Sequence, residues 1–334
     1  MTADPATAAG LALGAAADLL FADPRRGHPV AGFGAAAAAL QRHTWRDSRA
    51  AGVGYAAVCV GTAAALGTAG SRLTAGRPVA RTALTAATTW AVLGGTSLGR
   101  AADTMAQHLA ADDLPAARAH LSTLAGRDPS SLGEAELVRA TVESVAENTS
   151  DAAVAPLFWG AVAGLPGLLA YRAANTLDAM VGYRSPRYAR FGWASARLDD
   201  ALNWVPARLT AALTVLTAPV AGGSPAGAWR VWRRDGAAHP SPNAGRCEAA
   251  LAGALSLRLG GRNVYGERVE ERPTLGDGQP PVRGDIRRAV RLSRAVWTTA
   301  AALAAVSRLV RRGWTGRTAR GAGSTGKPAG STRA

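Results

Sequence analysis

The sequence is poor in the residues that build metal centres and disulfide frameworks. It contains two cysteines and five histidines among 334 residues. Cys59 and Cys247 are not spaced as metal ligands, and Cys59 falls within an apolar run, so we expect reduced, inward-facing thiols. No His-x-x-His or HExxH pattern occurs, which argues against a zinc site.

Signals for export and for nucleotide binding are also missing. The N-terminus has no basic region before its first apolar segment, so we expect no cleaved signal peptide. Gly321–Lys327 has the spacing of a phosphate-binding P-loop, but Pro328 stands where Ser or Thr should bind Mg²⁺, and no strand precedes the segment. The net charge of +15 suggests nucleic acid at first. The arginines lie between apolar runs without interleaved aromatic residues, however, so we expect cytoplasmic loops and no nucleic-acid partner.

Long uncharged runs are what the sequence does contain. Residues 50–70, 82–99 and 152–170 each form a run of 18 residues or more, enough to cross the ~30 Å hydrocarbon core as a helix. Weaker candidates are found at 5–22, 204–221 and 295–310. We therefore predict an all-α, polytopic membrane protein with roughly 4–6 spanning or re-entrant helices plus amphipathic loop helices. We expect residues 1–310 to form a single membrane domain and residues 311–334 a disordered basic tail.

The distribution of arginine gives a hypothesis for the topology. The arginine-rich loop at 23–49 is expected in the cytoplasm, and two spans later the loop at 100–150 returns there. A simple crossing at 152–170 would then put the next group of arginines outside, against the positive-inside rule. Because that run contains Pro156, Gly164 and Pro166, we expect it to be broken or re-entrant, with both polar flanks on the cytoplasmic side.

Carboxylates gather just before this run. Glu143, Glu147 and Asp151 follow one another at i, i+4 and i+8, which places them on one stripe of a helix, with Asn148 beside them. Such a group of hard oxygen ligands suits Mg²⁺, and we predict Glu147 and Asp151 as its ligands. A solvated acidic helix face would give the same spacing.

A second group of polar residues follows the run. Asn175 and Asp178, and likewise Asp199 and Asn203, present a carboxylate and an amide together at helical spacing. The arginines between and beside these pairs could hold phosphates or carboxylates, or could be anchors at the membrane surface. We expect a functional role for Arg184, Arg187 and Arg197. His28 and His239, each followed by proline in a polar loop, could bind substrate, move a proton or cap a turn.

Three long motifs of this sequence resemble one known family. ESVAENTSDAAVAPLFW, YRAANTLDAMVGYRSPRYARFGW and DGAAHPSPNAGRCEAALAG, together with the early DLLFADPRRGHPVAGFG, are similar to the CobD/CbiB family of cobalamin biosynthesis. The resemblance covers residues 10–310 in order. It implies a multi-pass protein of the inner membrane, with its active site facing the cytoplasm, that joins adenosylcobyric acid to (R)-1-amino-2-propanol or its O-phosphate. The product is adenosylcobinamide or its phosphate.

The resemblance implies an ATP-dependent amide ligase that uses ATP and Mg²⁺ as substrate and activator, with no tightly bound prosthetic group. It is also compatible with association with other late enzymes of the cobalamin pathway. Amide formation from a carboxylate needs metal ligands, cationic groups for phosphate and a base for the amine. We assign Glu143, Glu147, Asp178 and Asp199 to catalysis. We expect substrate or phosphate binding by Asn148, Asn175, Arg184, Arg187, Arg197, Asn203, His28, His239 and Asn243.

A non-enzymatic membrane protein is the alternative. A sensor or a transporter can also contain a buried network of acids and arginines, and the family is distantly similar to a sensor-like membrane group linked to β-lactamase regulation. A transporter would concentrate these groups in mid-span. Here they lie at the ends of apolar runs and in loops, which favours the enzyme.

Overall fold

The computed structural model describes residues 4–24, 27–126, 128–183, 185–265 and 268–320. Its helices are α1 (Pro5–Phe21), α2 (Pro29–Thr44), α3 (Arg49–Leu73), α4 (Pro78–Val92), α5 (Gly95–Ala110), α6 (Leu114–Leu121), α7 (Glu134–Thr149), α8 (Ala155–Ala163), α9 (Leu165–Leu177), α10 (Trp193–Thr217), α11 (Pro225–Asp235), α12 (Ala244–Leu255) and α13 (Arg283–Arg320). Wide π-helical turns form η1 (Ser150–Val154) and η2 (Asp178–Gly182), and a 3-10 turn forms η3 (Ala218–Ala221). The strands are β1 (Leu259–Tyr265) and β2 (Arg268–Leu275).

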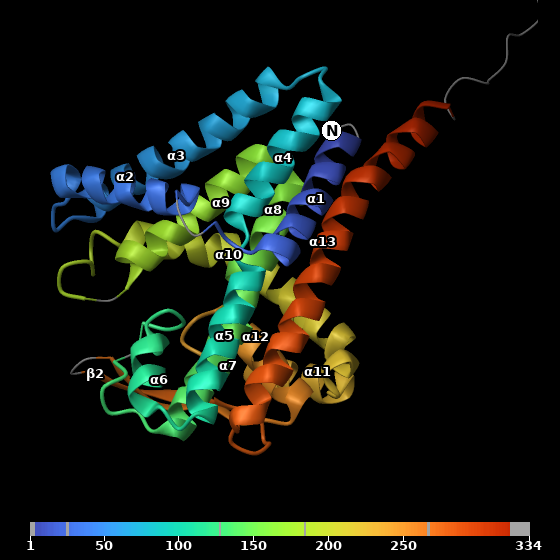
Figure 1. The fold of residues 1–334 in the computed structure, drawn as a ribbon. Coiled ribbons are helices and arrows are strands. Elements are labelled where there is room, and N and C mark those ends of the chain that lie inside the picture. The colour runs from blue at the N-terminus through green and yellow to red at the C-terminus, as the bar shows by residue number, and fades with distance from the viewer. Residues whose placement is uncertain (1–3, 25–26, 127, 184, 266–267, 321–334) are drawn as a thin grey trace, which may run out of the picture.

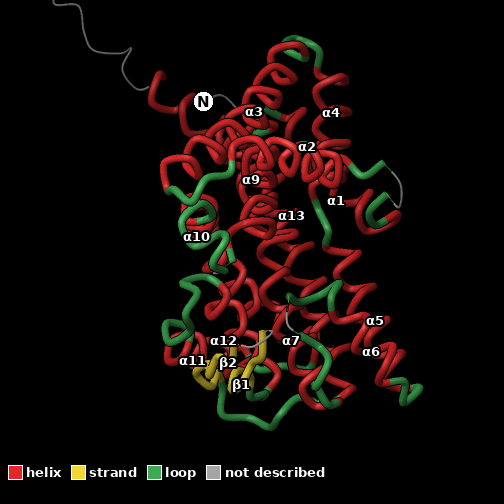
Figure 2. The backbone as a smooth tube through the Cα atoms, turned by 90° about the vertical axis from the view of Figure 1, so that its left-hand side faces the viewer, coloured by secondary structure: helices red, strands yellow, loops and turns green. Residues whose placement is uncertain are grey.

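The helices form two stacked regions that α13 connects. The upper region in Figure 1 contains α1–α4, α8 and α9, and the lower one contains α5–α7, α11, α12 and the β-hairpin. Figure 2 shows the same division from the side, with both strands in the lower region beside α11 and α12. One large apolar core runs through both regions, and Trp297 of α13, which is 1 % exposed, lies within it. The long helix α13 therefore fixes the two regions to each other.

The predominantly helical fold agrees with the prediction, and the run at 50–70 forms α3. In the part of the chain that the structure describes, two helices are long and apolar enough to cross a membrane. These are α3, and α10 continued through η3 to Ala221. Large apolar side chains on the outside of the upper region are widely exposed, as at Leu73 (76 %) and Val79 (82 %).

The run at 82–99 does not form one span, so that prediction is wrong. α4 ends at Val92, and α5 begins at Gly95. The first N–H groups of a helix lack partners within it, and here Oδ2 of the buried Asp18 accepts a hydrogen bond from the N–H of Thr96 at 2.9 Å. A carboxylate from α1 thus stabilises a helix start inside the uncharged run.

The run at 152–170 is broken, as predicted. α8 ends at Ala163, Gly164 follows with a positive φ of +68°, and α9 begins at Leu165. α8 and α9 pack against each other. A Cβ at Gly167 would lie 2.2 Å from the carbonyl oxygen of Trp159, so only glycine permits this close approach. The two polar flanks of the run therefore return to the same region of the molecule.

Two further parts of the prediction need correction or restriction. The fold is not purely helical, because β1 and β2 pair as an antiparallel hairpin in which Gly261 lies opposite Arg272. α13 continues through Arg320, so it occupies the first ten residues of the segment expected to be a disordered tail. Residues 321–334 lie outside the described part of the chain.

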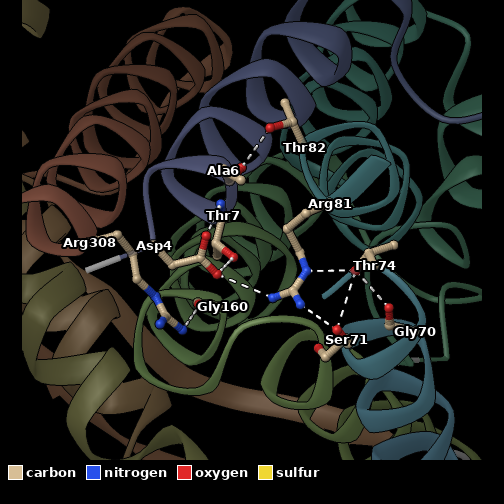
Figure 3. Close-up of polar contacts among 10 residues, drawn as sticks. All are labelled: Asp4, Ala6, Thr7, Gly70, Ser71, Thr74, Arg81, Thr82, Gly160 and Arg308. Carbon is tan, nitrogen blue, oxygen red and sulfur yellow. Dashed lines mark hydrogen bonds and ion pairs between the residues drawn. The ribbon is translucent and has the colours of Figure 1, made fainter. Parts of the chain in front are cut away.

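A polar cluster ties the N-terminal helices together at the top of the upper region (Figure 3). Arg81 of α4 forms an ion pair with Asp4 at 3.2 Å and donates to Thr74 at 2.6 Å. Nη2 of the buried Arg308 on α13 donates to the carbonyl oxygen of Gly160 at 3.0 Å. These contacts connect α1, α4, α8 and α13 away from the acidic residues described next.

Candidate active site

Polar residues from several separate segments line one large cavity of about 940 Å³. The carboxylates come from the end of α7, from η1, from η2 and from the start of α10. They are Glu147, Asp151, Asp178, Asp199 and Asp200. The loop before α12 and the strand β2 complete the wall. The structure thus brings together most of the acids that the sequence placed on different helices.

The π-helical turn η1 shapes the wall around Asp151. The N–H of Ala155 bonds to the carbonyl oxygen of Ser150 in the wide π pattern, and Pro156 has no N–H to offer to the carbonyl oxygen of Asp151. The hydroxyl of Tyr171 donates to that oxygen instead, at 3.2 Å. Pro156 therefore leaves the carbonyl oxygen of Asp151 without a partner in the turn, and Tyr171 supplies that partner.

A hydrogen-bond network holds Asp199 by both of its oxygens. Nδ2 of Asn203 donates to Oδ2 at 2.9 Å, and Nδ2 of Asn175 donates to Oδ1 at 3.3 Å. Tyr171 donates to Oδ1 of Asn203 at 2.9 Å, and Arg172 donates to Oδ1 of Asn175 at 3.4 Å. Because a guanidinium can only donate, Arg172 turns the amide of Asn175 so that its N–H groups face the carboxylate. Asp199 is therefore held as a hydrogen-bond acceptor.

Burial and the crowding of like charges raise the pKa values of Asp178 and Asp151. Burial first, and then the charges of Asp199, Asp200 and Glu147, raise the pKa of Asp178 from an ordinary 3.8 to about 7. Burial, followed by the charges of Asp199, Glu147 and Asp178, also raises the pKa of Asp151 well above its ordinary value. A carboxyl group whose pKa lies near 7 can both accept and release a proton at neutral pH. A bound cation would relieve the same repulsion.

The loop before α12 supplies the wall opposite the acids. Nδ1 of His239 accepts a hydrogen bond from the N–H of Ser241 at 3.0 Å, and its Nε2 lies 3.8 Å from Oε1 of Glu248. Both side chains of that pair are buried. Nδ2 of Asn243 donates to the carbonyl oxygen of Asp200 at 2.8 Å, which joins the loop to α10. His239 and Asn243 thus line the cavity, and their contact with substrate stays a prediction.

Arg272 is a cavity residue that the sequence did not reveal. It projects from β2, and it also lines a smaller polar cavity of about 190 Å³ that shares Glu147 and Asp151 with the large one. Asn148 lines this smaller cavity, where its Nδ2 donates to Oγ of Ser144 at 3.1 Å. The sequence could not identify Arg272, because its place in the cavity wall depends on the pairing of β1 with β2 and not on helical spacing. Ser150, Asp200 and Cys247 also line the large cavity without having been predicted.

Other predicted residues lie elsewhere or have local partners. Nδ1 of His28 accepts from the N–H of Val30 at 3.2 Å and caps α2, which is the turn-capping alternative. Arg187 is exposed and stacks over Trp45 with its Cζ 5.1 Å from the ring centre. Arg197 pairs with Asp200 at 3.6 Å on the outer side, and neither arginine lines the cavity.

Glu143 and Arg184 complete the predicted set. Glu143 is 2 % exposed, and its Oε1 accepts from the N–H of Gly260 at 2.8 Å and lies 3.8 Å from Arg139. It lines the small cavity but not the large one, and these contacts attach α7 to the start of β1. Arg184 lies outside the described residues.

The acids do not form a complete metal site by themselves. Across the described ranges, no three His, Cys, Asp or Glu side chains lie close enough together to hold a metal ion. Mg²⁺ usually takes one or two protein carboxylates and completes its shell with water and substrate phosphates. Burial and the charges of neighbouring acids raise the pKa of Asp151, which lines the cavity together with Glu147. These two carboxylates therefore suit Mg²⁺ that arrives with a phosphate.

Comparison with known proteins places the cavity within a family. A family model described as "CobD/Cbib protein" matches residues 11–293. The chain belongs to the CobD/CbiB family. A relative from Mycobacterium tuberculosis named "Cobalamin biosynthesis protein CobD" is 57 % identical over 299 residues, which cover 89 % of this chain and 94 % of the relative. Proteins of the same name from Geobacter metallireducens and Rhodobacter capsulatus are also similar. The first is 46 % identical over 280 residues, which cover 81 % of this chain and 88 % of the relative. The second is 44 % identical over 276 residues, which cover 81 % of this chain and 86 % of the relative.

No solved structure matches the chain. The CobD/CbiB match includes every described segment that lines the large cavity, from Gly126 to Arg272. It ends within α13, so the last part of that helix is not covered.

Proposed function

We propose that this CobD/CbiB protein is an ATP-dependent amide ligase of cobalamin biosynthesis. It joins a propionate carboxylate of adenosylcobyric acid to (R)-1-amino-2-propanol or its O-phosphate. The observation that carries the proposal is the large cavity, which Asp151, Asp178 and Asp199 line from three segments together with Arg272 of β2. The names of the relatives support the same pathway.

The chemistry requires an activated carboxylate and a neutral amine. In the proposed reaction the corrin carboxylate takes the terminal phosphoryl group of ATP, releasing ADP and forming an acyl phosphate. The amine nitrogen then attacks the acyl carbon, the new C–N bond replaces the C–O bond, and phosphate leaves. Bound Mg²⁺ would offset negative charge on the phosphate oxygens.

The residues of the chain have distinct parts in this reaction. Asp178, with its pKa of about 7, accepts the proton that the ammonium group must lose before attack. The guanidinium of Arg272 offsets charge on the phosphoryl group. Glu147 and Asp151 would hold Mg²⁺, and Asp199, held by Asn175 and Asn203, keeps its orientation toward the cavity.

We also propose that the upper region lies in the cytoplasmic membrane, with the cavity facing the cytoplasm. α3 and α10–η3 would span the bilayer, and α8–α9 would form a re-entrant pair. Exposed apolar side chains on α1, α3, α10 and α13 support this location, for example Phe21 (66 %), Leu66 (63 %), Leu216 (68 %) and Val306 (51 %). Reporter fusions after residues 148 and 185 should report the same side. Opposite sides would refute the re-entrant pair.

Complementation tests the enzymatic proposal. The gene should restore growth of a cobalamin auxotroph blocked at cobinamide formation, and the Asp178→Ala and Arg272→Ala variants should fail although both proteins reach the membrane. Supplied cobinamide should rescue every strain. Growth with Asp178→Ala in the absence of cobinamide would remove Asp178 from the mechanism, and failure of the wild-type gene would favour the sensor or transporter.

A further inference from the structure

A second cavity of about 400 Å³ lies between α2, α3, α4 and α9 in the upper region. Small-molecule sites typically have volumes of about 300–1,000 Å³ and mostly apolar walls. The walls here are built mainly from apolar side chains. They include Val30, Phe33, Ala63, Leu66, Ala91 and Leu169. The cavity shares no lining residue with the acidic one.

Arg172 is the charged residue among those that line this apolar cavity. Its Nη1 donates to Asn175 at 3.4 Å, but its Nε has no hydrogen-bond partner within the described chain. No carboxylate of the described residues lies within the 4.0 Å of an ion pair with it. Asp23 and Asp151 attract the guanidinium from beyond the distance of an ion pair, but neither accepts a hydrogen bond from the buried Nε, and a buried donor without an acceptor is costly. The cavity therefore offers one cationic contact at an otherwise apolar surface.

Arg172 of α9 and Leu66 of α3 line different parts of the cavity wall. α3 runs antiparallel to α9, because Gly67 of α3 meets Pro166 at the start of α9. Arg172 consequently lies near the level of Val92, where α4 ends and the chain leaves the upper region. Leu66 is 63 % exposed, so the cavity opens there to the outside. The cationic part of the wall faces the boundary between the regions, and the open part is apolar.

We propose that this cavity binds an anionic phospholipid, with its phosphate on Arg172 and an acyl chain along the apolar walls. The proposal relies on the membrane location of the upper region but not on the ligase reaction. The phosphate of an anionic lipid supplies the hydrogen-bond acceptor that Nε of Arg172 lacks, and the apolar walls suit a hydrocarbon chain. The choline headgroup of a zwitterionic lipid would return a positive charge next to the guanidinium, so such a lipid should bind more weakly.

Native mass spectrometry of the delipidated protein in detergent tests the proposal. The probes are phosphatidylglycerol and phosphatidylcholine with identical acyl chains. The wild type should retain one phosphatidylglycerol with about tenfold preference over phosphatidylcholine, as a single charge-assisted contact provides. Arg172→Gln should reduce this preference to about one. No preference in the wild type, or an unchanged preference in Arg172→Gln, would overturn the proposal.

Variants that fill the cavity separate a specific site from general lipid adhesion. Ala91→Leu and Ala87→Leu place bulk in the cavity, and either should abolish the retained phosphatidylglycerol. Ala83→Leu makes the same change at an exposed position of α4 that does not line the cavity, and it should bind as the wild type does. Two cavity-filling variants are used so that the test remains possible if one of them does not fold. Undiminished binding in a folded filling variant would contradict the proposed site. Since no turnover is measured, failure here would leave the ligase proposal intact.

Discussion

Replacing Asp178 with asparagine should stabilise the protein in a pH-dependent manner. Burial and three neighbouring acids raise the pKa of this carboxyl group from 3.8 to about 7. The folded state therefore binds the proton more tightly than the unfolded state does. The resulting loss of stability is absent below about pH 4, grows as the pH rises toward 7, and is complete above it. An asparagine side chain at this position has no charge to repel, so the variant should escape this loss.

The magnitude follows from the pKa change. One pH unit corresponds to about 1.4 kcal/mol, so the rise of Asp178 from 3.8 to about 7 sets an upper limit of about 4 kcal/mol at pH 8. Rearrangement of the neighbouring acids and water in the cavity reduce this value. A change of 1 kcal/mol shifts the melting temperature of a domain of about 150–250 residues by roughly 2–4 °C. We therefore expect Asp178→Asn to melt several degrees higher than the wild type at pH 8.

The assay is thermal unfolding of both proteins in detergent with a chelator, at several pH values from 5 to 8. The difference in melting temperature should shrink steadily toward pH 5. Asp103→Asn on α5 makes the same change away from the cavity and should show no such trend. Added Mg²⁺ should stabilise the wild type more than Asp178→Asn at pH 8. An Asp178→Asn variant that is less stable than the wild type at pH 8 would refute the account of repelling carboxylates.

Three further predictions concern the site and the packing. Arg272→Ala should reduce amide formation at least about tenfold, which is the effect of one lost charge-assisted contact. Arg187→Ala should retain most activity, because Arg187 stacks on Trp45 outside the cavity. Equal losses of activity in the two variants would contradict this placement. Tyr171→Phe should lower the free energy of unfolding by about 1–3 kcal/mol, since it removes the donor to Asn203 and to the carbonyl oxygen of Asp151, and an unchanged denaturation midpoint would argue against the network. Gly253→Ala should destabilise the contact of α11 with α12 by about 1–3 kcal/mol or more, because the new Cβ would lie 2.3 Å from the carbonyl oxygen of Gly227. Gly284→Ala has open space around its new Cβ and should leave the melting temperature unchanged in the same assay.

Local signals in the sequence predicted a large part of the fold. The length of the run at 50–70 predicted α3, and the glycines and prolines of 152–170 predicted the break at Gly164. The beginning of α5 at Gly95 could not be predicted in this way. It depends on a hydrogen bond from Asp18, a residue of a different helix that only the tertiary structure brings near. The same limitation applies to the β-hairpin, whose side-chain pattern is interrupted by turn residues.

The candidate site was predictable where helical spacing determines which residues are neighbours. Glu147 and Asp151, and likewise Asp199 and Asn203, share a helix face and line the cavity together. Spacing also grouped Glu143 with the first pair, although the N–H of Gly260 occupies its carboxylate. Contacts between distant segments decide such cases. The position of Arg272 also depends on contacts between distant segments, so the sequence did not predict it.

Amide formation by the purified protein tests the central claim most directly. Adenosylcobyric acid, ATP and Mg²⁺ are supplied with either aminopropanol or its O-phosphate, and the products are followed by mass spectrometry. We predict a corrin product whose mass has risen by that of one of the two amines less water, together with one ADP per amide formed. Arg272→Ala should form much less of this product at equal protein concentration. Folded wild-type protein that forms no amide with either amine while ATP and Mg²⁺ are present would contradict the account.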